Sequence, residues 1–138
     1  MATFTKFQPF VENLAEKVFN LGADTLKVAL TNVAPTNTFN QLSQITQIAN
    51  GNGYTTGGTA ATISSSAQSA GTYKLVLADV VFTATGSMGQ FRYAVLYDDT
   101  ATNDELIGSW DYGSAVDLLS GETFTVDFSA SNGVLQLV

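Results

Sequence analysis

The order of apolar and polar side chains predicts an amphipathic helix near the N-terminus. Apolar residues recur there at spacings of 3, 4, 4 and 3, which places them on one helical face: Phe7, Phe10, Leu14, Val18 and Leu21. Pro9 is tolerated in a first helical turn, and Gly22 suits a left-handed C-terminal cap. We therefore expect a helix within residues 1–22 that packs on a sheet.

The remaining residues, 23–138, show short alternating or apolar runs separated by turn residues, which is typical of β structure. The runs predict strands over residues 25–31, 60–67, 73–78, 80–85, 89–98, 106–112, 116–119, 122–129 and 134–138. A short second helix is expected near residues 40–50, where Leu42, Ile45 and Ile48 recur at helical spacing.

These elements together predict the fold class. We expect a single domain over residues 1–138, mainly β with an N-terminal α-helix. About eight or nine short strands with frequent turns favour a β-sandwich that is jelly-roll-like, with the helix covering an opening or an edge.

Charge is unevenly distributed along the chain. The sequence has 5 Lys+Arg against 12 Asp+Glu, a formal net charge of −7. No charged side chain lies between Lys27 and Lys74, and beyond Lys74 every charged side chain except Arg92 is acidic. A neutral polar surface can be buried against a partner without desolvating a charge. The neutral stretch is thus either an ordinary β-domain surface or an assembly surface.

Composition excludes several kinds of chemistry. The chain has no His and no Cys, so the usual zinc ligands, the thiol nucleophile and the commonest general base are missing. An acidic chain is a poor partner for nucleic acid, which is bound mainly through Lys and Arg. No apolar stretch approaches the roughly 20 residues that span a bilayer, and no signal peptide is visible. We expect a non-enzymatic protein with no cofactor, no metal and no membrane partner.

One acidic cluster is dense enough to consider as a metal site. It lies at an expected hairpin tip and contains Asp98, Asp99, Asp104 and Glu105. Oxygen-rich loops bind calcium, and Asn103 offers a further carbonyl. The spacing does not match an EF-hand loop, so we expect a solvated tip and keep a calcium site as the alternative.

Aromatic residues suggest a binding module as an alternative. Trp110 and Tyr112 flank an aspartate, a combination that suits sugar binding, but they share strand parity with Leu106. Shared parity predicts one sheet face, where an aromatic ring is more often part of the core. A carbohydrate- or receptor-binding β-module would use as stacking groups Trp110, Tyr112 and either Tyr54 or Tyr97.

Four segments resemble small acidic structural proteins of tailed bacteriophages: residues 22–32 (GADTLKVALTN), 71–79 (GTYKLVLAD), 91–98 (FRYAVLYD) and 119–128 (LSGETFTVDF). The N-terminal helix and residues 110–113 (WDYG) add to the resemblance, which covers most of the chain. It implies a virion component that acts by assembly rather than catalysis. The short chain favours a capsid decoration (cement) protein, and a tail or connector component is the alternative.

The resemblance also implies partners and a location. The expected partner is the major capsid protein or another virion protein, and we expect the chain to form a homo-oligomer. It would be synthesised in the host cytoplasm and act in the virion. The candidate interaction surface consists of apolar and aromatic side chains: Phe7, Phe10, Leu14, Val18, Trp110 and Tyr112.

Overall fold

The computed structural model describes residues 2–138. Its strands are β1 (Thr3–Lys6), β2 (Leu26–Thr31), β3 (Thr59–Ala61), β4 (Ile63–Ser69), β5 (Thr72–Leu77), β6 (Val80–Thr83), β7 (Phe91–Asp98), β8 (Leu106–Val116), β9 (Thr123–Val126) and β10 (Leu135–Leu137). Its helices are α1 (Gln8–Ala15) and the 3-10 turn η1 (Leu42–Gln44).

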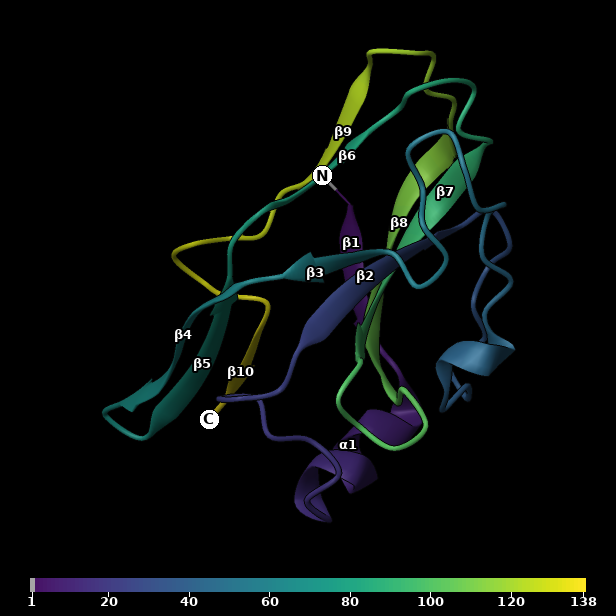
Figure 1. Cartoon of the computed structure of the whole chain (residues 1–138). Helices are drawn as coiled ribbons and strands as arrows, with labels where there is room; N and C mark the ends of the chain where they lie inside the picture. Colours follow the sequence, from purple (N-terminus) through teal and green to yellow (C-terminus); the bar gives the residue numbers. More distant parts are fainter. Residues whose placement is uncertain (1) are drawn as a thin grey trace.

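The strands form one large sheet and two small ones (Figure 1). The large sheet has the order β1-β8-β7-β2-β3, and every neighbouring pair in it is antiparallel. The small sheets have the orders β10-β5-β4 and β6-β9. The expected mainly β fold with one N-terminal helix is confirmed, with ten strands over the described part of the chain. The strand order does not confirm the jelly-roll connectivity, which stays a prediction.

Each face of the large sheet buries its own set of apolar side chains. On one face, β2 and β7 pack against the small sheets in a main core whose fully buried members include Val28, Leu30, Leu75, Phe82 and Leu96. On the other face, the intervening residues of the same strands join a second cluster that contains Phe7, Ala29, Ile45, Val95, Tyr97 and Leu106. Burial of both faces explains why β2 and β7 are apolar at most of their positions.

The N-terminal helix is shorter than the range 1–22 that periodicity predicts. Residues Thr3–Lys6 form strand β1, and helix α1 ends at Ala15. Lys17, with φ of +68°, terminates the helix in the left-handed conformation, so the cap expected at Gly22 lies five residues earlier in the chain. The amides of Lys17 and Val18 donate to the carbonyls of Leu14 and Asn13, which is the Schellman arrangement.

The expected helix near residues 40–50 is reduced to the single 3-10 turn η1. The Gln44 side chain accepts hydrogen bonds from the backbone amides of Asn40 and Gln41, which closes a capping box around this one turn. The chain then returns to extended pairing, because Gln47 forms a bridge with Thr31. Leu42 and Ile45 therefore cover the second face of the sheet, whereas Ile48 packs against the main core.

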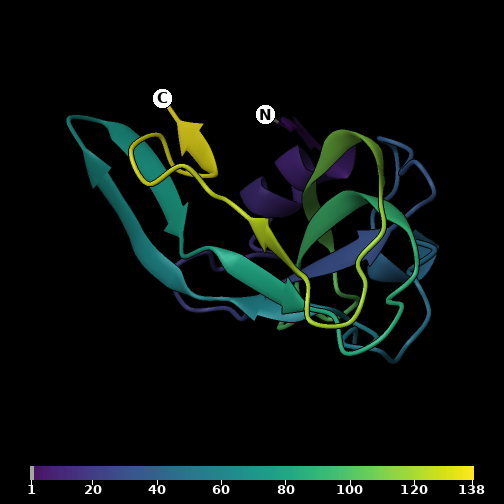
Figure 2. The same cartoon turned by 90° about the horizontal axis from the view of Figure 1, so that it is seen from above.

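Strands β4 and β5 form an arm that projects from the rest of the molecule (Figure 2). The arm is a hairpin with a tight turn, where Ala70 and Gly71 both have positive φ. The C-terminal strand β10 pairs with β5 and completes the three-stranded sheet of this arm.

Candidate interaction surface

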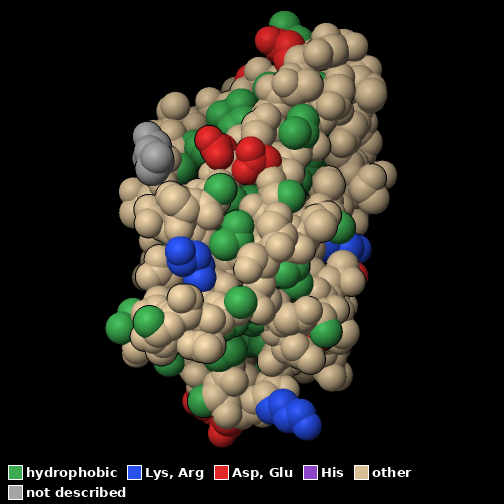
Figure 3. All heavy atoms as spheres, turned by 90° about the vertical axis from the view of Figure 1, so that its left-hand side faces the viewer, with side chains coloured by type: hydrophobic (Ala, Val, Ile, Leu, Met, Phe, Trp, Pro, Cys, Tyr) green, Lys and Arg blue, Asp and Glu red, His purple; other side chains and the backbone are tan. Residues whose placement is uncertain are grey.

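A groove of about 1560 Å³ lies between strand β1 and the C-terminal part of the chain. We call it the β1 groove. Its lining comes from residues 2–5, from the segment 110–113 of β8, from Ser64 of β4, from the end of β5 and the two residues after it, and from several residues between 125 and 134. Figure 3 views the molecule from the side of the projecting arm, and hydrophobic side chains there lie exposed beside acidic ones.

The floor of the β1 groove is aromatic. Trp110 is 9% exposed, and its ring centroid lies 5.0 Å from that of Phe4 and 5.4 Å from that of Phe128. Tyr112 is half-buried and meets Phe124 edge-on at 4.8 Å. These ring contacts link β8 to β1 on one side and to β9 and the segment after it on the other, because aromatic pairs at such distances add to the stabilisation from burial.

A glycine in β8 makes room for the attachment of β1. A Cβ atom at Gly108 would overlap the Phe4 ring, so the ring of Phe4 occupies space that any larger residue would fill. Phe4 and Trp110 are directly opposite in the antiparallel register. The absence of a side chain at Gly108 therefore lets the Phe4 ring pack closely over β8 and hold the edge strand in place.

The opposite wall of the groove is the loop that follows β9. Lys74 donates from its Nζ to the carbonyl of Ser131 at 2.6 Å, and the amide of Val134 donates to the carbonyl of Leu75 at 2.7 Å. Gly133 has a φ of +74° and lies so close to the Leu75 carbonyl that a Cβ would clash. This loop is thus tied to β5 by its backbone, which keeps the groove open.

One edge of β1 has no strand beside it. β1 pairs with β8 on one side only, and no other backbone hydrogen bond of Thr3–Lys6 is found within residues 2–138. Alternate residues of an edge strand direct their N–H and C=O groups away from the sheet. Thr3 and Thr5 are exposed at the groove. The groove therefore combines unpaired strand backbone with an apolar floor.

The charged side chains that line the groove, within the described residues, are three aspartates. Asp111 forms a bidentate ion pair with Arg92, at 2.8 and 3.0 Å, which lowers the pKa of the Asp111 carboxyl. Asp79 accepts one hydrogen bond, from the backbone amide of Phe128 at 2.9 Å. Asp127 is exposed. The rim of the groove is therefore negatively charged.

The residues expected to form one interaction surface lie in separate parts of the fold. Phe7 is 1% exposed in the second cluster, and Phe10 is 5% exposed in the main core, where its ring lies 5.3 Å from that of Phe19. Leu14 and Val18 are partly buried against the main core. Phe7 and Phe10 are thus not accessible to a partner in this folded chain, whereas Trp110 and Tyr112 lie at the β1 groove.

The aromatic residues expected to stack on a sugar are mostly inside the molecule. Tyr54 is 2% exposed, its hydroxyl donates to Gln47, and burial raises its pKa to about 12. Tyr97 is 1% exposed. Tyr112 is half-buried, and burial raises its pKa to about 12. Neither Tyr54 nor Tyr97 presents a ring face on which a sugar could stack.

The acidic tip holds its own loop together. Asp98 is fully buried, and its Oδ1 accepts hydrogen bonds from the amides of Thr100 and Ala101. Glu105 accepts from the amide and the side chain of Asn103. Among residues 2–138, no group of three or more acidic side chains is placed to hold a metal ion. In this structure, Asp98 and Glu105 stabilise the turn between β7 and β8.

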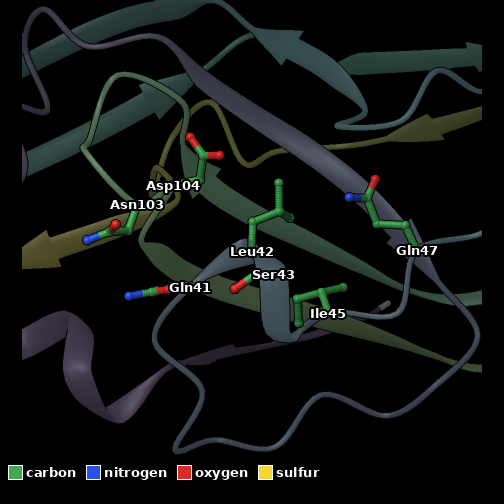
Figure 4. A pocket seen from close by; sticks show the side chains of 7 residues that line it. All are labelled: Gln41, Leu42, Ser43, Ile45, Gln47, Asn103 and Asp104. Carbon is green, nitrogen blue, oxygen red and sulfur yellow. The ribbon is translucent and has the colours of Figure 1, made fainter.

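A smaller hollow of about 390 Å³ lies beside this tip (Figure 4). It is lined by Gln41, Leu42, Ser43, Ile45, Gln47, Asn103 and Asp104. Amide and hydroxyl groups surround two aliphatic side chains there, and Asp104 is its charged member. The hollow contains no aromatic ring, so it lacks the platform that the carbohydrate-binding hypothesis requires.

The sequence pattern did not predict the β1 groove, because the expected helix range of 1–22 includes residues 3–6. The alternation of Thr3, Phe4, Thr5 and Lys6 is a strand signal that could have identified β1. The closeness of β1 to residues 127–134 depends on tertiary packing, and no local pattern predicts it.

Comparisons of the chain with protein-family models, with curated proteins and with solved structures find no match. Within residues 2–138, no helix is long and apolar enough to span a membrane.

Proposed function

We propose that this chain is a non-enzymatic structural protein of a tailed bacteriophage, and that it decorates and stabilises the capsid through protein–protein contacts. The sequence resemblance suggests the class of protein. The observation that carries the proposal is the unpaired and uncharged edge of strand β4 on the projecting arm (Figure 2).

Along Ser65–Ser69, strand β4 lacks the charges, prolines and bulges that usually protect an edge strand. It pairs with β5 on one side, and its other side has no partner strand within residues 2–138. Its seven residues include no charged side chain and no proline. A bulge interrupts the pairing between Ile63 and Ser65, and regular pairing continues to Ser69. Proteins that stay monomeric protect such edges with charges, prolines or bulges, because free backbone groups pair with other chains.

The position of β4 in the charge pattern also supports assembly. Copies of a chain with net charge −7 repel one another over most of their surface. Strand β4 lies in the stretch between Lys27 and Lys74 that has no charged side chain. Contact through β4 therefore avoids both like-charge repulsion and the desolvation of charges. On a capsid, many modest contacts of this kind add up through avidity.

The proposal is tested by measuring the copy number of the chain in purified phage particles. Particles from cells that produce the chain are washed, and the chain and the major capsid protein are quantified by mass spectrometry. We expect a fixed stoichiometric ratio to the major capsid protein. Absence of the chain from washed particles would contradict the proposal, and recovery only with isolated tails would support the tail alternative instead.

A matched pair of variants tests whether the β4 edge makes the contact. Ser65→Lys places a charge on the exposed edge of β4, and Ser43→Lys places the same charge on an exposed residue within the 3-10 turn η1. We expect both variants to fold, by circular dichroism, and Ser65→Lys alone to reduce particle occupancy by about tenfold. Equal occupancy of the two variants would show that the β4 edge is not the contact.

A further inference from the structure

We propose that the β1 groove binds an extended peptide segment of a partner protein, apolar on one side and carrying Lys or Arg, which adds as a strand to the free edge of β1. This inference rests on the proposed function, because it names the chemistry of a partner that a protein acting by assembly would bind. The groove touches β4 at Ser64, but the backbone edge that the peptide would use is that of β1 and not that of β4.

The free backbone edge of β1 can pair with an added strand. A peptide laid along the outer side of Thr3–Lys6 would pair with N–H and C=O groups that have no partner within residues 2–138. Strand addition of this kind gives affinity through main-chain hydrogen bonds. The ring of Phe4 on Gly108 holds β1 in position, so little ordering of the edge is needed on binding.

The aromatic floor of the groove can contact one face of the added strand. Alternate side chains of an added strand point toward the same face of the sheet as Phe4, where Trp110, Tyr112 and Phe128 lie. The volume of about 1560 Å³ exceeds the range of roughly 300–1,000 Å³ that is usual for small-molecule sites. An apolar peptide face therefore fits this groove better than a small ligand does.

The negative charge of the groove rim favours a positively charged peptide. Asp79 and Asp127 have no ion-pair partner within residues 2–138. The nearby lysines, Lys6 at the end of β1 and Lys74 bonded to Ser131, lie outside the groove lining. A second copy of the chain would bring its own acidic residues to this rim, and like charges placed opposite each other are destabilising. Cationic side chains on the peptide would instead complement Asp79 and Asp127.

Trp110 makes the groove directly observable. It is the only tryptophan of the chain and lies on the groove floor, so its fluorescence reports occupancy of this site. The probe is a blocked peptide of about eight residues in which valine alternates with lysine, long enough to run along the edge of β1. The comparison peptides replace lysine by glutamate, or carry N-methyl groups on alternate amides that remove strand hydrogen bonds.

We expect the lysine peptide to change the emission of Trp110 on titration into the full chain. The glutamate and N-methylated peptides should bind at least about tenfold more weakly. Asp127→Lys should weaken binding of the lysine peptide by about tenfold. Asp117→Lys, the same change at an exposed acid outside the groove lining, should leave that affinity unchanged.

Several results would overturn the inference. Equal binding of the lysine and glutamate peptides, or no binding of the lysine peptide at millimolar concentration, would exclude a basic strand. An equal effect of Asp127→Lys and Asp117→Lys would indicate general charge attraction. A change in Trp110 emission with protein concentration alone would mean that a second copy occupies the groove. None of these results bears on the copy number in particles, so the two proposals fail separately.

Discussion

Asp98 shows how a single buried carboxyl can set the pH response of this protein. Its Oδ2 has no hydrogen-bond partner, whereas Oδ1 accepts two amides. Burial, and then the neighbouring carboxyl of Asp24, raise the pKa of Asp98 from 3.8 to about 7. A proton shared with Asp24 would give Oδ2 the hydrogen bond that it lacks. The protonated form is thus the better fit to this site.

The raised pKa predicts a loss of stability with increasing pH. Because the folded state holds the Asp98 proton more tightly than the unfolded state, this contribution is fully present below about pH 4 and is lost as pH rises through about 7. Asp98→Asn keeps the acceptor for the two amides and cannot ionise. We expect the variant to be more stable than the natural chain above pH 7, by about 2 kcal/mol, in thermal unfolding.

The same series of melts contains the control. Asp117→Asn alters an exposed carboxyl and should leave the pH dependence of Tm unchanged. If the Tm of Asp98→Asn fell with pH over this window as steeply as that of the natural chain, Asp98 would not be the group responsible.

Two variants of helix α1 distinguish packing of the helix on its own chain from docking of the helix on a neighbouring protein. Leu14 is partly buried against the main core, whereas Val11 on the same helix is 53% exposed. We expect Leu14→Asp to lower the free energy of unfolding by about 2–3 kcal/mol, because it places a charge against an apolar cluster. Val11→Asp should change it by less than about 0.5 kcal/mol.

Urea unfolding of the two variants distinguishes the roles of the helix. An unchanged unfolding midpoint for Leu14→Asp, combined with loss of particle binding, would mean that this face docks a neighbour instead of packing on the chain.

Several strands could be predicted from the sequence because their signal is local. The alternation of residues 25–31 gave β2 nearly at its observed bounds, and the runs at 73–78 and 89–98 correspond to β5 and β7. The expected strand over residues 116–119 is absent, and β8 extends through Val116 instead. These differences fall at element ends, where turn and pairing geometry outweigh side-chain pattern.

Other features depend on pairing between distant segments and could not be predicted. The register between β7 and β8 shifts between Leu96 and Tyr97, and Leu106 therefore lies on the opposite face from Trp110 despite their shared parity. Such a bulge inverts the faces of every residue beyond it. Of the candidate site, sequence identified Trp110 and Tyr112, while the edge of β1 and the acids opposite it come together only in the fold.

At the scale of the whole molecule, charge predicts how association responds to salt. Repulsion between copies of net charge −7 is screened as ionic strength rises, whereas the contact through the uncharged β4 edge is not weakened. We expect self-association, measured by sedimentation velocity, to increase between about 0.01 and 0.5 M salt. The affinity of the β1 groove for the lysine peptide should fall over the same range. Self-association that decreased with salt would argue against the β4 contact.

The two proposed contact surfaces, the β4 edge and the β1 groove, differ in charge. The β4 edge is neutral and suits contact with other uncharged strand edges, whereas the β1 groove is acidic and suits a basic segment. Both use unpaired strand backbone, which is a common means of assembly among β proteins. A protein with these two edges can join a lattice through one and hold a partner segment through the other.

Electron cryomicroscopy of washed phage particles, at a resolution that separates β-strands, tests whether this chain decorates the capsid. We expect density for this mainly β fold at regular positions on the capsid, with the β4 edge at a contact. Particles whose capsid density contains no such fold, from cells that produce the chain in soluble form, would contradict it.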